Sequence, residues 1–433
     1  MVVMLNTRDP GFAAAFADLI EKNRAEKTDV DATVAGILAD VRARGDAALI
    51  EYTQRFDRVA LTPKTLAFLK SEIGAGAAAS NIALVNAIDT AATRITEYHR
   101  KQMPSDELYT DRTGVKLGWK WTPVASAGLY VPGGTAALFS SVLMNAVPAK
   151  VAGVQRLVVV MPTPDGRTNP AMLAACAIAG VDEVYRVGGA QAIGALAYGT
   201  DTIKSVDKIV GPGNAYVASA KRQVFGRVGI DMVAGPSEVT VVADAKNDPM
   251  WIAADLMAQA EHDASSQSVL ITDDAGFARR VAEAVDTLLK TLPRAAIAAK
   301  SWQDNGAIVI VGALSEAPEL VNRMAPEHVQ LAVENPGALE PGIRHAGAIF
   351  MGRLTPEALG DYIAGPSHVL PTSGTARFAS GLGVFDFLKR TSLIDVGLGP
   401  LSVLGPPAVA MAEAEGLAAH AMSIALRVKG ARG

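Results

Sequence analysis

The spacing of hydrophobic and polar residues divides this 433-residue chain into parts of different character. Over residues 10–26 the apolar side chains recur as on one face of a helix, which Phe12, Phe16, Leu19 and Ile20 share. Residues 30–56 and 65–103 continue the helical pattern. The first part of the chain is therefore predicted to be helical.

Short strand-like segments appear after residue 115. Val115–Trp121 alternates like a strand, and Leu157–Met161 is a short apolar run of the kind that is covered on both faces of a sheet. Further strands are predicted at 125–131, 183–187 and 208–210, with helices over 169–180 and after Gly188 and Gly211. This alternation predicts a doubly wound parallel sheet over residues 130–235.

A second series of strands and helices follows. Strands are predicted at 240–243, 268–272, 307–311 and 348–351, with helices at 250–261, 275–291 and 316–324. After Gly381 the pattern loosens: Ser402–Pro407 is interpreted as a Gly/Pro-rich link and Ala408–Val428 as a final helix that must pack on another surface. The predicted fold is α/β, with two incomplete, doubly wound Rossmann-like domains and small helical segments at both ends.

Composition excludes several classes of protein. Half of the residues are hydrophobic, 19% are charged, and the net charge of −4 comes from interspersed residues, with no basic stripe for nucleic acid. No apolar run is long enough to span a bilayer, and polar residues interrupt the N-terminus too early for a signal peptide. The single Cys176 stands in an apolar helical context, is predicted to be a small buried residue, and fits a reducing cytoplasm.

Three glycine-rich turns follow predicted strands. They are Tyr130-Val-Pro-Gly-Gly-Thr, Val187-Gly-Gly-Ala-Gln191 and Val210-Gly-Pro-Gly-Asn214. Glycine lets the backbone approach an anion, and the N–H groups that begin a helix bind phosphate. The chain has no complete G-x-G-x-x-G sequence, and an ordinary strand-to-helix turn is the more common explanation for any one of the three. Three in one sheet favour a dinucleotide at the carboxyl ends of the strands.

The chain has only six histidines, and four have chemically suggestive neighbours. Imidazole is the commonest metal ligand and transfers protons near neutral pH. These four are found in Gln259-Ala-Glu-His262, Pro326-Glu327-His328, Gly365-Pro-Ser-His368 and Glu415-Gly-Leu-Ala-Ala-His420. His99 and His345 are predicted to be surface residues without a function.

Gln259 and His262 are three positions apart on a predicted helix and so share one face. Zinc needs four ligand positions, which Asp361 and His420 could complete, although an isolated pair of this kind is more often a helix surface feature. Glu327 and His328 suit acid–base work. Pro326 predicts that they open a helix, where solvated charges would be an equally good explanation.

Taken together, the motifs resemble histidinol dehydrogenases, which catalyse the last two steps of histidine synthesis. The resemblance runs from about residue 115 to 420. It rests on Gly128-Leu-Tyr-Val-Pro-Gly-Gly-Thr, Ser141–Val154, Val187–Ile193, Ile209–Val217, Ala234-Gly-Pro-Ser-Glu, Leu256–Asp263, Ala325-Pro-Glu-His, Gly360-Asp-Tyr, His368-Val-Leu-Pro-Thr, Asp386-Phe-Leu-Lys-Arg and Glu413–His420.

The resemblance implies an NAD-dependent oxidation of L-histidinol through L-histidinal to L-histidine in a homodimer with shared active sites. One zinc ion per subunit would be held by Gln259, His262, Asp361 and His420, and Glu327 and His328 would be the acid–base pair. Tyr130, Gln191 and Asn214 would contact NAD. The substrate would meet the zinc ligands, His328, Ser237, His368 and Glu415, with Glu415 and His420 acting in the partner's site.

The resemblance also implies a division of labour among segments. Residues 1–26 would form an N-terminal helical segment, and 27–129 with 237–380 a first Rossmann-like domain that carries most of the zinc and catalytic site. Residues 130–236 would bind NAD, and 381–433 would reach the partner subunit. Two positions depart from the family pattern: Ser367 replaces a usual asparagine, and Phe139 a common proline.

Three other functions remain compatible with parts of this pattern. One is a related dehydrogenase of another polar alcohol, such as a sulfonated diol, although the carboxylate of Glu415 better suits a cationic substrate. Another is a zinc hydrolase with Glu327 as base, which would need no dinucleotide turns. The third is a non-catalytic metal-binding protein, which would leave the Glu327–His328 pair without a purpose.

Overall fold

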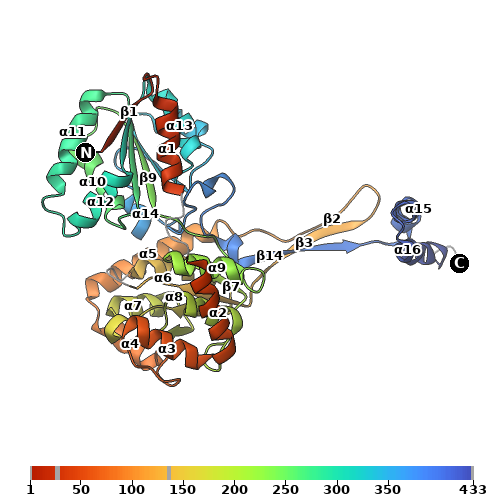
Figure 1. Cartoon of the computed structure of the whole chain (residues 1–433). Helices are drawn as coiled ribbons and strands as arrows, with labels where there is room; N and C mark the ends of the chain where they lie inside the picture. Colours follow the sequence, from red (N-terminus) through yellow and green to blue (C-terminus); the bar gives the residue numbers. More distant parts are fainter. Residues whose placement is uncertain (1, 25–29, 134–137, 431–433) are drawn as a thin grey trace. The chain divides into compact units, whose positions relative to one another are not determined.

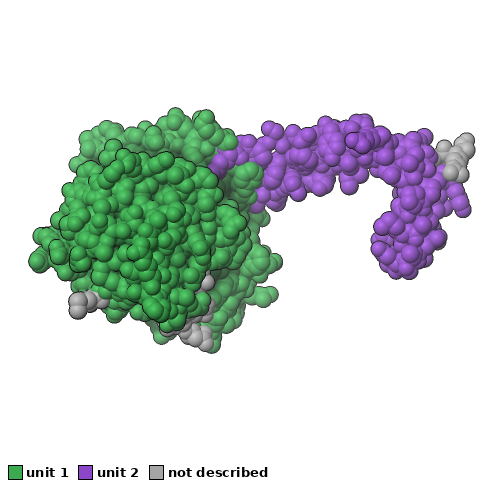
Figure 2. Space-filling view, turned by 90° about the horizontal axis from the view of Figure 1, so that it is seen from above, with its two compact units in different colours: residues 1–101, 125–387 green, residues 102–124, 388–433 purple. Residues whose placement is uncertain are grey.

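A computed structural model describes residues 2–24, 30–133 and 138–430 of the chain. The chain forms two compact units, coloured separately in Figure 2: residues 1–101 with 125–387, and residues 102–124 with 388–433. Within the described ranges, no helix combines the length and apolar character needed to cross a lipid bilayer.

The first unit contains a six-stranded parallel sheet with the strand order β1-β11-β10-β9-β12-β13. Figure 1 labels β1 and β9 of this sheet. Neighbouring residues Val241 and Val242 point to opposite faces of this sheet. Val241 packs in the cluster of α10, α11 and α12, and Val242 in that of α1 and α13. The strands are β1 (Val3–Asn6), β9 (Glu238–Ala243), β10 (Gln267–Thr272), β11 (Ala307–Ile310), β12 (His328–Ala332) and β13 (Ala348–Met351). The helices are α1 (Phe12–Arg24), α10 (Pro249–Ala260), α11 (Ala275–Leu288), α12 (Ala295–Asn305), α13 (Ala317–Met324) and α14 (Ala358–Tyr362).

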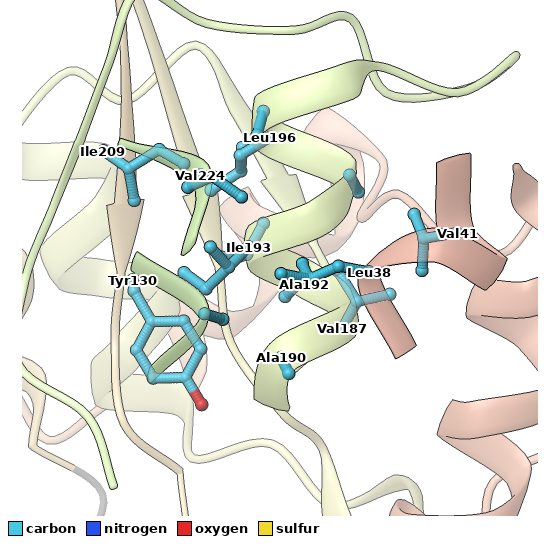
Figure 3. Close-up of a cluster of buried hydrophobic side chains, with 14 of the residues drawn as sticks. Leu38, Val41, Tyr130, Val187, Ala190, Ala192, Ile193, Leu196, Ile209 and Val224 are labelled. Atoms are coloured by element: carbon cyan, nitrogen blue, oxygen red, sulfur yellow. The ribbon is translucent and has the colours of Figure 1, made fainter. Parts of the chain in front are cut away.

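The same unit contains a five-stranded parallel sheet with the order β6-β5-β4-β7-β8. Helices α2, α3, α8 and α9 form one apolar cluster with it, part of which Figure 3 shows. The strands are β4 (Ser126–Tyr130), β5 (Arg156–Val160), β6 (Glu183–Tyr185), β7 (Lys208–Val210) and β8 (Gly229–Ile230). The helices are α2 (Asp31–Arg44), α3 (Asp46–Asp57), α4 (Lys70–Ala79), α5 (Ile82–Arg100), α6 (Phe139–Ala152), α7 (Pro170–Ile178), α8 (Gly189–Tyr198) and α9 (Ala215–Val224). Two parallel sheets with covering helices confirm the predicted α/β class.

The second unit consists of a three-stranded antiparallel sheet and two helices. Its strands are β2 (Glu107–Thr110), β3 (Lys116–Pro123) and β14 (Leu388–Asp395), with β3 in the centre, and its helices are α15 (Leu398–Ala414) and α16 (Ala418–Gly430). Its helices and sheet leave large apolar side chains exposed, among them Ile394, Leu398, Val403, Met411 and Leu426. A surface of this kind is typical of a segment that packs against another surface.

Leu196 of α8 is a sensitive point of the core around the five-stranded sheet (Figure 3). It is fully buried, and it lies so close to β4 that a Cβ added at Gly128 would be 2.7 Å from its Cδ1. We expect Leu196→Ala to lower the free energy of unfolding by about 2–5 kcal/mol because it leaves a cavity. Urea unfolding followed by circular dichroism measures this, with Leu354→Ala, at a position 80% exposed, as the matched control. Equal urea midpoints for Leu196→Ala and Leu354→Ala would contradict the close packing of Leu196 against β4.

Two local predictions near the functional motifs were wrong. Glu327 and His328 do not open a helix: α13 ends at Met324, Ala325 adopts a left-handed conformation with φ of 50°, and His328 begins the fully buried strand β12. The stretch Ser402–Pro407 is not a link, because α15 runs through it with Pro406 and Pro407 inside the helix. The break falls at Gly416, with φ of 75°.

His99 is not a surface residue, contrary to the prediction. It lies in α5 one helical turn after the buried Ile95, is fully buried, and its Nδ1 is 2.8 Å from the carbonyl oxygen of that residue. Burial lowers the pKa of His99. Strand β14 and helix α12 were also missed, since their sequences carry too many polar residues for a clear apolar period.

Candidate active site

A cavity of about 240 Å³ lies within the first unit, between loops that belong to the two sheets. Residues that follow β4, β7 and β8 contribute from the carboxyl ends of the five-stranded sheet, and residues at the amino ends of β9 and β12 contribute from the six-stranded sheet. Among the predicted site residues, its lining includes Asn214, Ser237, Gln259, His262, Glu327, His328, Asp361 and His368. The fold therefore brings together chemistry from positions spread over the sequence.

Glu327 and His328 are held by the neighbouring strand β9. The backbone N–H of Glu238 donates to Glu327 Oε2 at 2.9 Å, and His328 Nδ1 lies 3.0 Å from the Glu238 carbonyl oxygen. Since a carbonyl oxygen can only accept, this contact assigns the imidazole proton to Nδ1 and leaves Nε2 as the proton acceptor. Burial lowers the pKa of His328 to about 4, so the ring is neutral near pH 7.

Burial acts on Glu327 in the opposite direction. It raises the pKa of this carboxyl group well above its ordinary value, and the nearby charges of Glu238 and Asp361 add to the effect. The backbone hydrogen bond from Glu238 opposes the shift. A buried carboxylate with a raised pKa is a stronger base once ionised, which suits proton transfer from water.

Glu357 is a site residue that the sequence analysis missed. Its carboxylate is buried, and its Oε1 lies 3.5 Å from His328 Nε2. Burial, together with the charges of Asp361 and Asp255, raises the pKa of Glu357 to about 8. A detectable signal was its spacing, because Glu357 stands four positions before Asp361 at the start of α14 and therefore shares a side of that helix.

Gln259, His262 and Asp361 have donor atoms suited to a metal ion. Gln259 is buried on α10, and neither its Oε1 nor its Nε2 has a hydrogen-bond partner within the described residues. Buried amides are normally paired, so this one indicates a missing ligand. His262, two residues past the end of α10, has its Nε2 3.6 Å from Asp361 Oδ2. Nitrogen and oxygen ligands of this kind are what zinc binds.

A second possible metal group overlaps the first. Atoms of His328, Glu357 and Asp361 that could bind an ion lie within 4.8 Å of one another. The two groups share Asp361. A metal on His328 Nε2 would remove the only unprotonated nitrogen of the proposed base, whereas one at Gln259 and His262 would leave it free.

His368 completes one side of the cavity. Its Nδ1 is 3.1 Å from the backbone oxygen of Asp361, and its Nε2 is 3.3 Å from Ser141 Oγ. Burial alone would raise the pKa of Asp361, but the hydrogen bond from His368 and the charges of the neighbouring histidines lower it below its usual value. Ser367 is buried and donates to the carbonyl of Met144 at 3.1 Å, so it anchors the loop.

The residues predicted to contact a dinucleotide lie at the carboxyl ends of the five-stranded sheet. Tyr130 ends β4 and accepts a hydrogen bond from Gly189 N–H at 3.1 Å, and burial raises its pKa to about 12. Gln191 is buried in the first turn of α8. Asn214 caps α9, with its Oδ1 accepting from Tyr216 N–H at 3.1 Å. Part of the first glycine turn, Gly134-Thr135, lies outside the described residues.

Four predicted residues are not in the cavity lining. Tyr130 and Gln191 lie in the first unit without lining the cavity. Glu415 and His420 belong to the second unit, where Glu415 follows α15 and His420 is in the first turn of α16. Both are exposed within the single chain.

Comparisons with known proteins give one consistent result. The family model described as histidinol dehydrogenase matches residues 20–428. The chain is 61% identical to the histidinol dehydrogenase of Rhodospirillum rubrum and 59% identical to that of Ruegeria pomeroyi, each over 99% of both chains. It is also similar to the crystal structure of histidinol dehydrogenase from Elizabethkingia anophelis, with a TM-score of 0.94, 35% identity, and coverage of 100% of this chain and 99% of that one.

Proposed function

The chain belongs to the histidinol dehydrogenase family, and from that premise we propose that it oxidises L-histidinol through L-histidinal to L-histidine. NAD⁺ would be the oxidant and a zinc ion the metal. The supporting observation is the Glu327–His328 pair. The bond of His328 Nδ1 to Glu238 leaves Nε2 unprotonated, and both residues of the pair line a cavity bordered by glycine loops of a parallel sheet. This is a base placed beside the edge where such sheets bind dinucleotides.

We assign the proton steps to this pair. As hydride leaves the alcohol carbon, His328 Nε2 takes the hydroxyl proton, which yields the aldehyde. Glu327 then takes a proton from water as the water oxygen bonds to the aldehyde carbon, and protonated His328 returns its proton to the former carbonyl oxygen. The resulting hydrate loses a second hydride to NAD⁺ and a hydroxyl proton to His328 to give the acid. Both steps would use this one site, so the reactive aldehyde need not leave between them.

We propose that zinc is held by Gln259, His262 and Asp361 of one subunit and His420 of its partner. When bound, zinc would orient the substrate's amine and imidazole, and NAD⁺ bound near Tyr130, Gln191 and Asn214 would accept hydride. The unpaired amide of Gln259 and the proximity of His262 to Asp361 support this ligand set. Ser237 and His368 would contact the substrate from the cavity wall.

We also propose a homodimer in which residues 381–433 complete the partner's site. The exposed apolar side chains of α15 and α16 support an interface, and the exposure of Glu415 and His420 within one chain leaves both available to a partner. Glu415 would then offer a carboxylate to the cationic substrate. The NAD-binding role of residues 130–236 and the cytoplasmic location belong to the same proposal.

One titration tests the proposed reaction. Purified protein with zinc is mixed with excess NAD⁺ and limiting L-histidinol, and absorbance of the reduced nicotinamide is followed. We expect two molecules of reduced nicotinamide per histidinol, loss of activity with a chelator, and its return with zinc. One molecule per histidinol would show that the reaction stops at the aldehyde. Turnover of a sulfonated diol but not histidinol would favour the related dehydrogenase, and no reduction with either would contradict the proposal.

A further inference from the structure

We propose that the buried ion pair of Lys221 and Asp231 is a positioning device for the dinucleotide. It would hold the loop Gly211–Asn214 in the conformation that receives the phosphates of NAD. The inference rests on the proposed use of NAD and adds two residues that lie in the cavity wall but take no part in the proton steps.

The ion pair forms hydrogen bonds with both backbone polar groups of Gly211. Lys221, in α9, is 2% exposed, and its Nζ donates to the Gly211 carbonyl oxygen at 2.9 Å. Asp231, directly after β8, accepts the Gly211 N–H at Oδ2 over 2.8 Å, and the two side chains form an ion pair with each other. Side chains from two separate elements therefore fix the first residue of the loop.

Gly211 needs such a tether because its conformation is unusual. Its φ of 109° lies in the region that favours glycine, and an added Cβ would be 2.2 Å from the Tyr130 carbonyl oxygen. The loop is therefore pressed against the end of β4. Glycine leaves the backbone intrinsically free to move, and no larger residue fits at this position. The two charged side chains therefore restrain the backbone of Gly211.

The fixed loop presents unpaired donors to the cavity. Asn214 Oδ1 takes the N–H groups of Tyr216 and Val217, whereas those of Gly213, Asn214 and Ala215 have no partner in the part of the chain that the structure describes. Gly213 and Asn214 line the cavity. Free N–H groups at the start of a helix bind phosphate.

Lys221 also controls the charge of this wall. Asp231 lines the same cavity, and without its cation it would present a negative charge to the phosphates of NAD. Loss of Lys221 should thus be worse for the dinucleotide than loss of both charges together.

The test compares Lys221→Met with Lys221→Met/Asp231→Asn in the zinc-loaded enzyme. We expect Lys221→Met to raise KM for NAD⁺ by about tenfold or more, and the double variant by only about threefold, with KM for histidinol within about twofold of wild type in both. Equilibrium binding of NADH, followed by its fluorescence, should weaken in parallel. Zinc content should be unchanged. Lys150→Met, which breaks the surface ion pair with Asp182 far from this loop in sequence, is the matched control and should leave both KM values unchanged.

The outcomes separate this inference from the proposed function. Wild-type protein that neither binds NADH nor reduces NAD⁺ would contradict the function itself. With active wild type, a folded Lys221→Met enzyme whose KM for NAD⁺ stays within about twofold would overturn the positioning role, as would equal rises in both KM values. If Lys221→Met does not fold, the double variant decides by the same criterion, since it removes the unpaired charge.

Discussion

Glu327→Gln is expected to abolish most oxidation of histidinal while leaving hydride removal from histidinol largely intact. Glutamine keeps the shape of the side chain and can still accept the hydrogen bond that Glu238 N–H donates at 2.9 Å, so β9 and β12 should remain in register. It cannot take a proton from water. Because general-base catalysis contributes about 10²–10⁴-fold, histidinal oxidation should fall by about that factor.

The direction in which histidinal oxidation changes with pH is a second test of the role of Glu327. Burial raises the pKa of Glu327, so the ionised form that accepts a proton becomes more populated as pH rises. Histidinal oxidation by the wild type should therefore increase with pH through that raised pKa, and the Glu327→Gln variant should lose this dependence. If the residual histidinal oxidation of the variant still increases with pH, the pH dependence belongs to another group.

The measurement follows reduced nicotinamide separately from histidinol and from histidinal under single-turnover conditions. Glu334→Gln is the matched control. It makes the same substitution just beyond the other end of β12, at an exposed side chain that pairs with Lys246. It should leave both half-reactions unchanged. Equal loss of both half-reactions in Glu327→Gln would assign Glu327 to binding or structure instead of water activation.

Much of the fold could be predicted because its strands and helices carry simple periods. The parallel strands β5 and β9 are short apolar runs, and α1 repeats an apolar face through Phe16 and Leu19, so periodicity sufficed. The start of β12 could not be predicted this way. Glu327 directly precedes this strand and His328 is its first residue. Their polarity resembles a solvated helix start, while their burial depends on contacts with β9, far away in sequence.

The candidate site was harder to predict because it lies between the carboxyl edge of the five-stranded sheet and the amino edge of the six-stranded sheet. Gly211 follows a strand of the five-stranded sheet, whereas Ser237 and His328 stand where strands of the six-stranded sheet begin. No local pattern indicates that the carboxyl edge of one sheet faces the amino edge of another. Glu357 was missed for the same reason: next to Pro356 it looks like an ordinary helix start, and only the fold places its carboxylate beside His328 Nε2.

Activity should return when two inactive variants are combined in one dimer. His262→Asn removes a proposed zinc ligand from the first unit, and His420→Asn removes one from the second. If His420 serves the partner's zinc, a mixed dimer has one site with both defects and one site with none. Purified heterodimers should then show about half of wild-type activity and bind about one zinc per dimer.

A matched combination tests the trans arrangement itself. His262→Asn and Asp361→Asn both lie in the first unit, so their heterodimer has one defect in each site and should remain inactive. The two heterodimers, made by co-expression with different affinity tags, differ only in which unit carries the second change. Absence of recovery in verified His262→Asn/His420→Asn heterodimers would place His420 in its own subunit's site or outside the zinc site. Recovery in that pair alone requires that each site draws on both chains, because zinc needs all its ligands within bonding distance of one ion.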